Sequence, residues 1–213
     1  MKKFISAIAL SAIAFSSAYA AAIPGLYNTG AGASGTIDSN YALTVISGDT
    51  ISDGAYISQD SDLRGEWLPN SNTSKWLTPT SNARESLDPF TAGEYSYSLT
   101  FTLTADQAAS ASFLGRYAAD NEVAVYLNGQ LISSGAGFGG WTDFGASSGF
   151  LAGVNGLQFS VTNYALDAGN PTGLRVEFAD ASVPSAVPEP ATYAMMLGGL
   201  GLLGAVARRK QRA

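Results

Sequence analysis

Residues 93–103, GEYSYSLTFTL, decide the fold of this chain. In this stretch tyrosine, leucine and phenylalanine alternate with serine and threonine, and the alternation continues to Thr104. Successive side chains of a β-strand point to opposite faces, so the pattern predicts a half-buried strand. We expect its aromatic and leucine face to point into a core and its hydroxyl face to point outward.

Similar alternation recurs on both sides of this stretch. Asn128-Gly129 predicts the turn of a hairpin, because both residues tolerate the positive φ of a type I′ turn. Helical periodicity is almost absent, and only residues 105–110 suggest a short turn of helix. An all-β fold, an antiparallel β-sandwich, is therefore predicted. Its further strands are expected at residues 41–46, 54–58, 111–117, 123–127, 157–161 and 174–178 and from Leu131 onward.

Regions of low periodicity set the expected boundaries of the sandwich domain, residues 21–180. Residues 21–40 are rich in small and polar residues, so we expect an extended or loosely ordered lead-in. Residues 135–149 are rich in glycine and predict a loop that carries Trp141. Residues 181–187 are expected to form a linker to the C-terminal segment.

The first 20 residues have the three parts of a secretory signal peptide. Met1-Lys2-Lys3 is a positive region, residues 4–15 are apolar, and Ala18-Tyr19-Ala20 is a small-residue cleavage site. This order predicts export through the Sec translocon and cleavage by signal peptidase after Ala20. The first mature residue would then be Ala21.

The C-terminal residues combine a proline motif, an apolar run and a basic cluster. The apolar run, residues 191–207, carries no charge and lies between Val187-Pro188-Glu189-Pro190 and Arg208-Arg209-Lys210-Gln211-Arg212. As a helix its 17 residues would extend about 26 Å, close to the ~30 Å hydrocarbon core of a bilayer. A single transmembrane helix is therefore predicted, with the basic cluster on the cytoplasmic side and the domain outside.

This C-terminus, residues 188–212, resembles the PEP-CTERM sorting signal of exopolysaccharide-producing Gram-negative bacteria. The resemblance implies an exosortase, a membrane-embedded cysteine transpeptidase, as the partner that removes the helix. The protein would be anchored transiently in the inner membrane and then reach the cell envelope or extracellular matrix. An ordinary membrane anchor that is never cut is the alternative. The residues that carry the resemblance are Val187, Pro188, Glu189, Pro190, Arg208, Arg209 and Lys210.

Between the two targeting segments the chain is strongly acidic. Residues 21–187 contain five basic and 16 acidic residues, a net charge of −11. Nucleic acids need clustered positive charge, so none is expected as a partner, whereas neutral glycans are compatible with this charge. The chain has no cysteine and no histidine, so its core must hold without disulfides and the commonest catalytic base is missing.

Catalytic motifs are weak in this sequence. Residues 145–149 fit the G-x-S-x-G pattern of a serine nucleophile, but no histidine and no helical pattern accompany them. Paired carboxylates are the remaining catalytic equipment, and 16 acids make chance pairs inevitable. We therefore expect a protein that is not an enzyme and has no cofactor.

The block of residues 93–178 resembles the jelly-roll domains of the galactose-binding-like class. Such domains often bind sugars, although many serve only as structural modules. The resemblance implies a jelly-roll form of the predicted sandwich. It is carried by residues 115–121, 123–129, 153–157, 161–163 and 172–176.

Four residues are candidates for glycan binding. Asp120 and Asn121 are expected at a rim of the sheet together with Asn128, and Trp141 has an aromatic face that suits a pyranose ring. The alternative is local, with the short polar side chains bonding backbone in tight turns and the tryptophan packing in the core or a loop. A structural Ca²⁺ beside Asp120 and Asn121 is compatible with their chemistry but has no further support in the sequence.

Three functions follow in order of preference. The first is an exported, non-enzymatic surface or matrix protein with a structural or adhesive role linked to exopolysaccharide or biofilm. The second is a carbohydrate-binding module that uses the four candidates. The third, a distant one, is an enzyme that acts on a polysaccharide.

Overall fold

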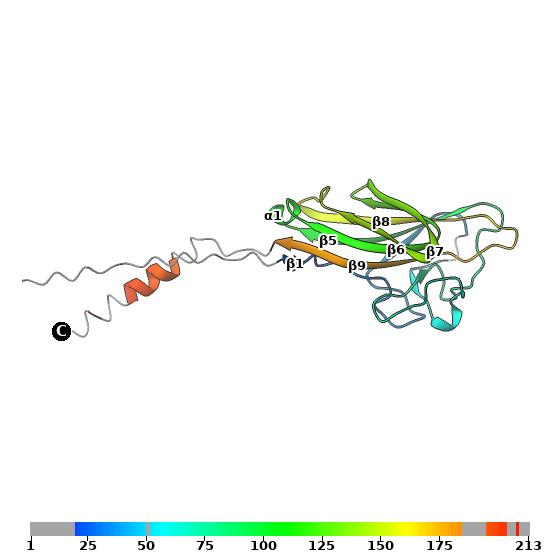
Figure 1. Ribbon diagram of the computed structural model, residues 1–213, viewed down its shortest axis with the longest axis horizontal. Helices are drawn as coiled ribbons and strands as arrows, with labels where there is room; N and C mark the ends of the chain where they lie inside the picture. The colour runs from blue at the N-terminus through cyan, green and yellow to red at the C-terminus, as the bar shows by residue number, and fades with distance from the viewer. Residues whose placement is uncertain (1–19, 50–51, 185–194, 204–207, 209–213) are drawn as a thin grey trace, which may run out of the picture. The chain divides into compact units, whose positions relative to one another are not determined.

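The structure is a computed structural model that describes residues 20–49, 52–184, 195–203 and 208 (Figure 1). The chain divides into two units, Ala20–Pro184 and a unit made of Met1–Tyr19 with Ser185–Ala213. In the second unit residues 195–203 are helical and exposed. None of the helices in the described part of the chain is both long and apolar enough to cross a membrane.

The predicted targeting segments fall mostly on residues that the structure does not describe. Residues 1–19 of the predicted signal peptide lie outside the described ranges, as does much of the predicted transmembrane helix 191–207. Among the sorting residues only Arg208 is described, in helical conformation. The others, which lie outside the described residues, are Val187, Pro188, Glu189, Pro190, Arg209 and Lys210.

Residues 20–184 form an antiparallel β-sandwich, so the predicted fold class is confirmed. The strands follow one another in the order β2-β5-β8-β6-β9-β4-β3, while β7 also pairs with β6 and β1 with β9. The elements are β1 (Ala20–Ala22), β2 (Ala42–Ser47), β3 (Tyr56–Ile57), β4 (Leu77–Thr78), β5 (Gly93–Leu103), α1 (Ala105–Ala108), β6 (Ser112–Leu127), β7 (Gln130–Ala146), β8 (Gly153–Asn163) and β9 (Gly173–Pro184).

Strand β6 belongs to both layers of the sandwich. Its first part, Ser112 to Asp120, pairs with β9, and its second part, Glu122 to Leu127, pairs with β8. The change of partner falls at Asp120-Asn121, where the peptide bond is cis. The sheet therefore folds over at this position, and the two layers face each other across one core (Figure 1).

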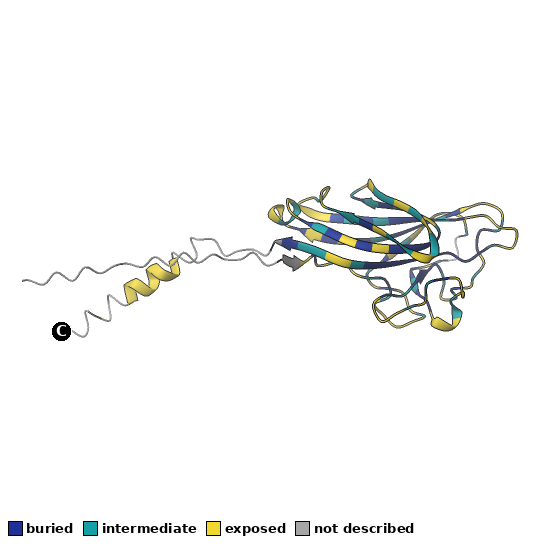
Figure 2. Cartoon of the chain, in the orientation of Figure 1, coloured by how far each residue is buried: buried dark blue, intermediate teal, exposed yellow. Residues whose placement is uncertain are grey.

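The apolar face predicted for residues 93–103 forms the centre of this core. Its five large side chains, together with aromatic residues of the other layer, are buried, and Figure 2 shows the alternation of buried and exposed residues along the strands. Phe144 of β7 contacts both Tyr117 of β6 and Phe159 of β8, with ring centroids 5.6 Å apart in each pair. The buried side chains of β5 are Tyr95, Tyr97, Leu99, Phe101 and Leu103.

The predicted hairpin is confirmed, but the loop predicted after it is wrong. Asn128 and Gly129 both have positive φ, 51° and 80°, and join β6 to β7. The segment predicted as a glycine-rich loop, residues 135–149, is strand as far as Ala146. Strand β7 pairs only with β6, and of its side chains only Phe144 is buried. An edge strand with so little buried surface needs no apolar alternation, which explains why the sequence suggested a loop.

Two predicted boundaries also shift. Strand β9 continues to Pro184, so it includes four residues of the expected linker 181–187. The lead-in expected to be loosely ordered instead follows β9: the Ile23 N–H donates to the Ala181 carbonyl oxygen (3.1 Å), and Asn28 Oδ1 accepts from the Phe178 N–H (2.7 Å). Single bonds of this kind leave no periodicity in the sequence.

Candidate functional site

A pocket of about 280 Å³ lies between loops, at the end of the sandwich where β9 begins. We call it the loop pocket. Its wall combines carboxylate, amide, guanidinium and apolar side chains contributed by strands β6 and β7 and by two loops that are far apart in sequence. Its lining residues are Arg64, Glu66, Trp67, Asp120, Asn121, Phe138, Leu166, Asn170 and Pro171.

Asp120 is the buried acid of the loop pocket, with 5% of its surface exposed. Its Oδ2 accepts a hydrogen bond from Trp67 Nε1 at 2.8 Å, and its Oδ1 accepts one from Asn121 Nδ2 at 2.5 Å. Burial raises the pKa of Asp120 to about 6, although these two donors and the nearby charge of Arg64 oppose the rise. The carboxyl group therefore changes charge in a mildly acidic environment.

Asn121 links the pocket to the loop that follows β8. Its Oδ1 accepts a hydrogen bond from the Tyr164 N–H at 2.7 Å. The Thr172 hydroxyl donates to the backbone carbonyl of Asp120 from the other side. Asp120 and Asn121 are thus held in place where β6 passes from one layer to the other. Their carboxyl and amide groups are therefore already fixed in position before any ligand binds.

Aromatic packing forms the base of the loop pocket. Trp67 packs on Trp76 with ring centroids 4.4 Å apart, and both indoles are buried. Phe138 of β7 packs against this cluster, and its carbonyl oxygen accepts a hydrogen bond from the Leu68 N–H at 2.9 Å. Arg64 and Glu66 are exposed, so they lie where the pocket meets solvent.

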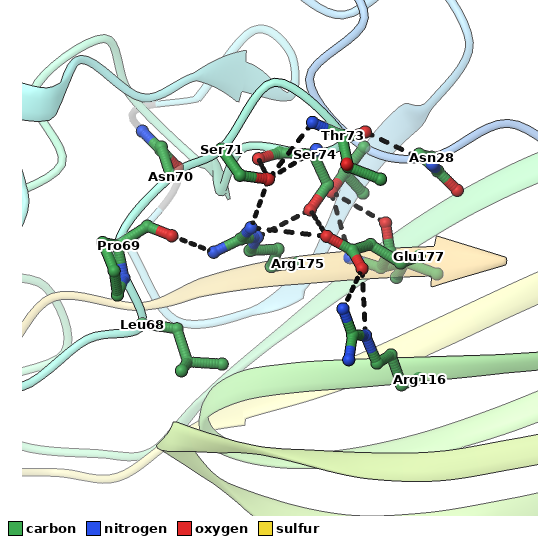
Figure 3. Close-up of polar contacts among 12 residues, drawn as sticks. Asn28, Leu68, Pro69, Asn70, Ser71, Thr73, Ser74, Arg116, Arg175 and Glu177 are labelled. Carbon is green, nitrogen blue, oxygen red and sulfur yellow. Dashed lines mark hydrogen bonds and ion pairs between the residues drawn. The ribbon is translucent and has the colours of Figure 1, made fainter. Parts of the chain in front are cut away.

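A buried ion network holds the loop that carries Trp67 (Figure 3). Arg175 of β9 is 3% exposed and donates to Ser71, Ser74 and the carbonyl oxygen of Pro69. The Ser74 hydroxyl donates to Glu177 Oε1 at 2.7 Å, and Arg116 Nη2 contacts Glu177 Oε2 at 2.6 Å. These bonds fix the loop against the outer face of β9.

The charge of Glu177 is stabilised within this network. Burial alone would raise the pKa of Glu177, but hydrogen bonds from Ser74 and Arg116, with the charges of Arg116 and Arg175, bring it below its ordinary value. The pKa of Arg175 is lowered by burial, and the carboxylate of Glu177 opposes this effect. The buried charges of Arg175 and Glu177 therefore both have hydrogen-bond and ion-pair partners within the network.

The structure brings only two of the four predicted glycan-binding residues together. Asp120 and Asn121 line the loop pocket, whereas the guanidinium groups of Arg116 and Arg175 lie over the Trp141 ring, 4.5 and 4.8 Å from its centroid. Asn128 is in the β6–β7 turn, where its Oδ1 accepts from the Gly156 N–H at 2.9 Å. Trp141 and Asn128 thus have structural contacts of their own.

Arg64, Glu66 and Phe138 of the loop pocket were not recognised from the sequence. Arg64 and Glu66 lie in a loop without periodicity, and Phe138 lies in the segment that was predicted as a loop. A signal was present in the charge count, since Arg64 is one of only five basic residues between positions 21 and 187. Its guanidinium forms no ion pair with any described residue, unlike those of Arg116 and Arg175.

A second hollow, of about 480 Å³, lies on the outer face of β5, β8 and β6. Glu94 and Glu122 are in register with the same residue of β8, Thr162, one from each side. This hollow is larger than the loop pocket, but its lining includes neither a buried carboxylate nor a tryptophan. We therefore place the candidate site at the loop pocket. No group of three or more acidic side chains among the described residues is arranged to hold a metal ion.

Comparison with known proteins identifies the C-terminal segment. Residues 186–211 match the PEP-CTERM protein-sorting motif, which confirms the resemblance noted in the sequence. The motif marks the chain as an exported protein that carries a membrane sorting signal and is processed by an exosortase. No curated protein matches the sequence.

Several solved structures are similar in part. A β-glucosidase from Kluyveromyces marxianus has 13% identity and a TM-score of 0.36, with 77% of this chain and 20% of that chain covered. A β-glucuronidase from Ruminococcus gnavus has 14% identity and a TM-score of 0.32, with 68% and 30% covered. A family 35 carbohydrate-binding module from an environmental isolate has 16% identity and a TM-score of 0.30, with 69% and 95% covered. The matched regions are less than a third of the two glycosidase chains.

Proposed function

We propose that this exported protein is a non-enzymatic component of the cell surface or extracellular matrix, and that it adheres to exopolysaccharide through the loop pocket. The observation that carries the proposal is the buried carboxyl group of Asp120, which lines a 280 Å³ pocket together with Asn121, an indole and a phenyl ring. A linked role in biofilm formation is part of the same proposal.

The chemistry of the loop pocket suits a sugar. A pyranose has hydroxyl groups that both donate and accept, and C–H faces that pack on aromatic rings. Arg64 offers donors, Glu66 offers acceptors and the amide of Asn121 offers both, while Phe138 and Leu166 supply apolar surface. Charges of both signs line the pocket, so a neutral sugar is favoured over an ionic one.

The position of the loop pocket suits adhesion. Pro171 of the pocket lies two residues before β9, and the sorting motif begins two residues after β9 ends. Because β9 has 12 residues, its first and last residues are about 36 Å apart at ~3.3 Å per step. The sandwich would therefore present the pocket at the end opposite to its attachment to the sorting signal.

Glycan retention by the secreted protein tests the binding site. We expect the wild type to be retained on exopolysaccharide of the producing cell and on at least one neutral glycan of an array. Arg64→Ala should reduce retention at least tenfold without affecting folding, because Arg64 is exposed and forms no ion pair among the described residues. Lys75→Ala, which removes a cation outside the pocket, is the matched control and should bind normally, as should Trp141→Ala. Absence of retention by the wild type would refute the glycan site.

Intact mass of the released protein tests the sorting pathway. We expect a chain that begins at Ala21, after signal peptidase cleavage, and lacks Met195 and Met196, after exosortase cleavage. Deletion of the exosortase should leave both methionines in place. A released protein that keeps them in the wild-type strain would contradict C-terminal processing.

A polysaccharide-active enzyme is the alternative, because Asp120 and Glu66 line the same pocket and the pKa of Asp120 is about 6. A general acid in a glycosidase has a similarly raised pKa. However, both carboxylate oxygens of Asp120 already accept hydrogen bonds, from Trp67 and Asn121, which favours a binding role. Turnover of the producer's polysaccharide that disappears in Asp120→Asn would replace our proposal with this one.

A further inference from the structure

A further hollow adjoins the loop pocket at a single turn of the chain. This hollow, of about 440 Å³, shares Arg64 and Trp67 with the loop pocket, and we call it the turn hollow. The Trp67 N–H donates to the Arg64 carbonyl oxygen at 3.1 Å, so residues 64–67 form a β-turn that lines both cavities. The remaining residues that line the turn hollow are Asp60, Leu63, Gly65, Pro69 and Asn70.

The segment that carries this turn is tied at its base and on both sides. Asn70 Nδ2 donates to Asp60 Oδ1 at 2.9 Å, which joins the two ends of the segment. Arg84 donates to two carbonyl oxygens before the turn, each at 3.1 Å, and Trp76 Nε1 donates to the Leu68 carbonyl oxygen after it, at 2.8 Å. Compact loops with joined ends are frequently functional. Because the segment is already ordered, a ligand does not have to pay the entropy of ordering it.

We propose that the loop pocket and the turn hollow form one cleft, which binds at least two consecutive sugar units of a neutral polysaccharide, one unit in each cavity. This proposal rests on the proposed function and deepens it, because it makes the ligand a chain and not a single sugar. The loop pocket alone, at about 280 Å³, is slightly smaller than typical small-molecule sites of ~300–1,000 Å³. It therefore suits a ligand of about one sugar unit.

The turn hollow has the groups that a second sugar unit needs. Asp60 is exposed, and its carboxylate offers acceptor positions beyond the one that Asn70 uses. Leu63 and Pro69 supply apolar surface for the C–H groups of a sugar ring. The charges of Asp60 and Arg64 are opposite in sign, so the turn hollow, like the loop pocket, favours a neutral sugar.

Arg64 is the residue that connects the two cavities. It lines both of them, it is exposed, and it forms no ion pair with any described residue. A guanidinium group carries five N–H donors, which is enough to serve hydroxyl groups on both sides of the turn. Once one unit of a chain is bound, the binding of the next unit is intramolecular, so the affinity for a chain exceeds that for its separate units.

Competition by fragments of defined length tests the cleft. The secreted protein is bound to immobilised exopolysaccharide of the producing cell and displaced by fragments of one to six sugar units, which are prepared by partial hydrolysis of the same polysaccharide. We expect the concentration needed for half displacement to fall at least tenfold between one and three units. Beyond three units it should change less than threefold, because both cavities are then filled.

Gly65→Leu tests the turn hollow separately. Gly65 lines the turn hollow but not the loop pocket, and an added Cβ meets no atom within 4 Å, so the new side chain fills the hollow without a clash. We expect the variant to lose the tenfold gain with length and to be displaced by single units as the wild type is. Gly156→Leu is the matched control: its Cβ also meets no atom within 4 Å, it lines neither cavity, and the gain should persist.

Two results would overturn the cleft while the proposed function stands. One is retention on exopolysaccharide with equal displacement by fragments of one and three units. The other is a gain with length that persists in Gly65→Leu. Failure of the wild type to bind the intact exopolysaccharide would instead refute the proposed function, and the cleft with it.

Discussion

The interior of the sandwich and the loop that covers the outer face of β9 are both well packed, but by different means. The interior is apolar, with Tyr95, Tyr97 and Phe159 fully buried between the layers. The covering loop, residues 68–76, is held by buried charges, with Arg175 and Glu177 of β9 bonded to Ser74. One region depends on apolar area removed from water, and the other on the satisfaction of polar groups that burial would otherwise penalise.

This difference predicts how each region responds to substitution. An apolar side chain can be shortened at a cost set by the lost area and the cavity that remains. A member of a buried ion network cannot be removed alone, because its partner is left charged and unsatisfied. Single and double substitutions should therefore behave differently in the two regions.

The largest effect is expected in the interior. Phe159→Ala should lower the free energy of unfolding by about 4 kcal/mol, because it removes a fully buried ring that contacts Phe144. Phe159 lies in the middle of the sheet, in register with Tyr97 of β5 and Val125 of β6. Urea denaturation followed by tryptophan fluorescence measures the change. Phe90→Ala is the matched control: Phe90 is 88% exposed, so a loss of similar size there would contradict the assignment of the core.

A smaller but non-additive effect is expected in the covering loop. Arg175→Met should lower the free energy of unfolding by about 3 kcal/mol, because it removes the donor to Ser71, Ser74 and the Pro69 carbonyl oxygen and one of the two cations beside Glu177. The double variant Arg175→Met, Glu177→Leu should recover at least half of that loss, because the buried carboxylate that had lost one of its two cations is removed as well. Additive losses in the double-mutant cycle would show that the network contributes by packing and not by charge.

The contrast also explains which parts of the molecule could be predicted. The strand of residues 93–103 and the Asn128-Gly129 hairpin were predicted because alternation and turn chemistry are local signals. The start of strand β7 at Leu131 was predicted, but its continuation from Gly135 to Ala146 was missed, because β7 lies at an edge where only Phe144 needs to be buried. The N-terminal segment was missed because its bonds to β9 join residues about 150 positions apart, such as Asn28 and Phe178.

The candidate site was predicted only in part for the same reason. Asp120 and Asn121 stood out because they lie between the strands predicted at residues 111–117 and 123–127, where they were expected at a rim of the sheet. Their partner Trp67 comes from a loop 53 positions earlier, and nothing local indicates that its indole reaches Asp120. Trp141 was chosen for its aromatic face, yet its neighbours are two arginines from β6 and β9, which only the register of the strands brings together.

The pH dependence of stability gives a test at the loop pocket. Asp120 has a pKa of about 6 in the folded protein, above its ordinary value of 3.8. Between pH 3.8 and pH 6 the Asp120 carboxyl group ionises in the unfolded chain but stays largely protonated in the folded protein. Its contribution to stability is therefore complete below about pH 4 and is lost as the pH rises through 6. Asp120→Asn removes this dependence. The difference in unfolding free energy between wild type and variant should therefore change by roughly 2 kcal/mol, in favour of the wild type at low pH.

Urea denaturation of both proteins at pH 4, 5, 6 and 7 measures this change. Glu177 has the opposite effect: its lowered pKa stabilises the fold at pH values above the pKa that this residue has in the unfolded chain. This contribution is the same in the wild type and in Asp120→Asn, so it cancels in the difference. Asp143→Asn, at an exposed position of β7, is the control. A difference that is constant over this pH range would show that Asp120 is not buried as a titrating acid.

The smallest effect is expected at Trp141, on the boundary between the two regions. Its ring is 4.5 Å from the Arg116 guanidinium and 4.8 Å from that of Arg175, but Trp141 is only half-buried and the Arg116 side chain is 45% exposed. Cation–π contacts at such sites contribute about 0.5–1 kcal/mol each, so Trp141→Ala should cost about 1 kcal/mol and Trp141→Phe about half as much. Urea denaturation of the two variants measures both losses. A loss near 3 kcal/mol would mean that the indole is needed to keep Arg175 in its network, and would make the covering loop as dependent on aromatic packing as the interior is.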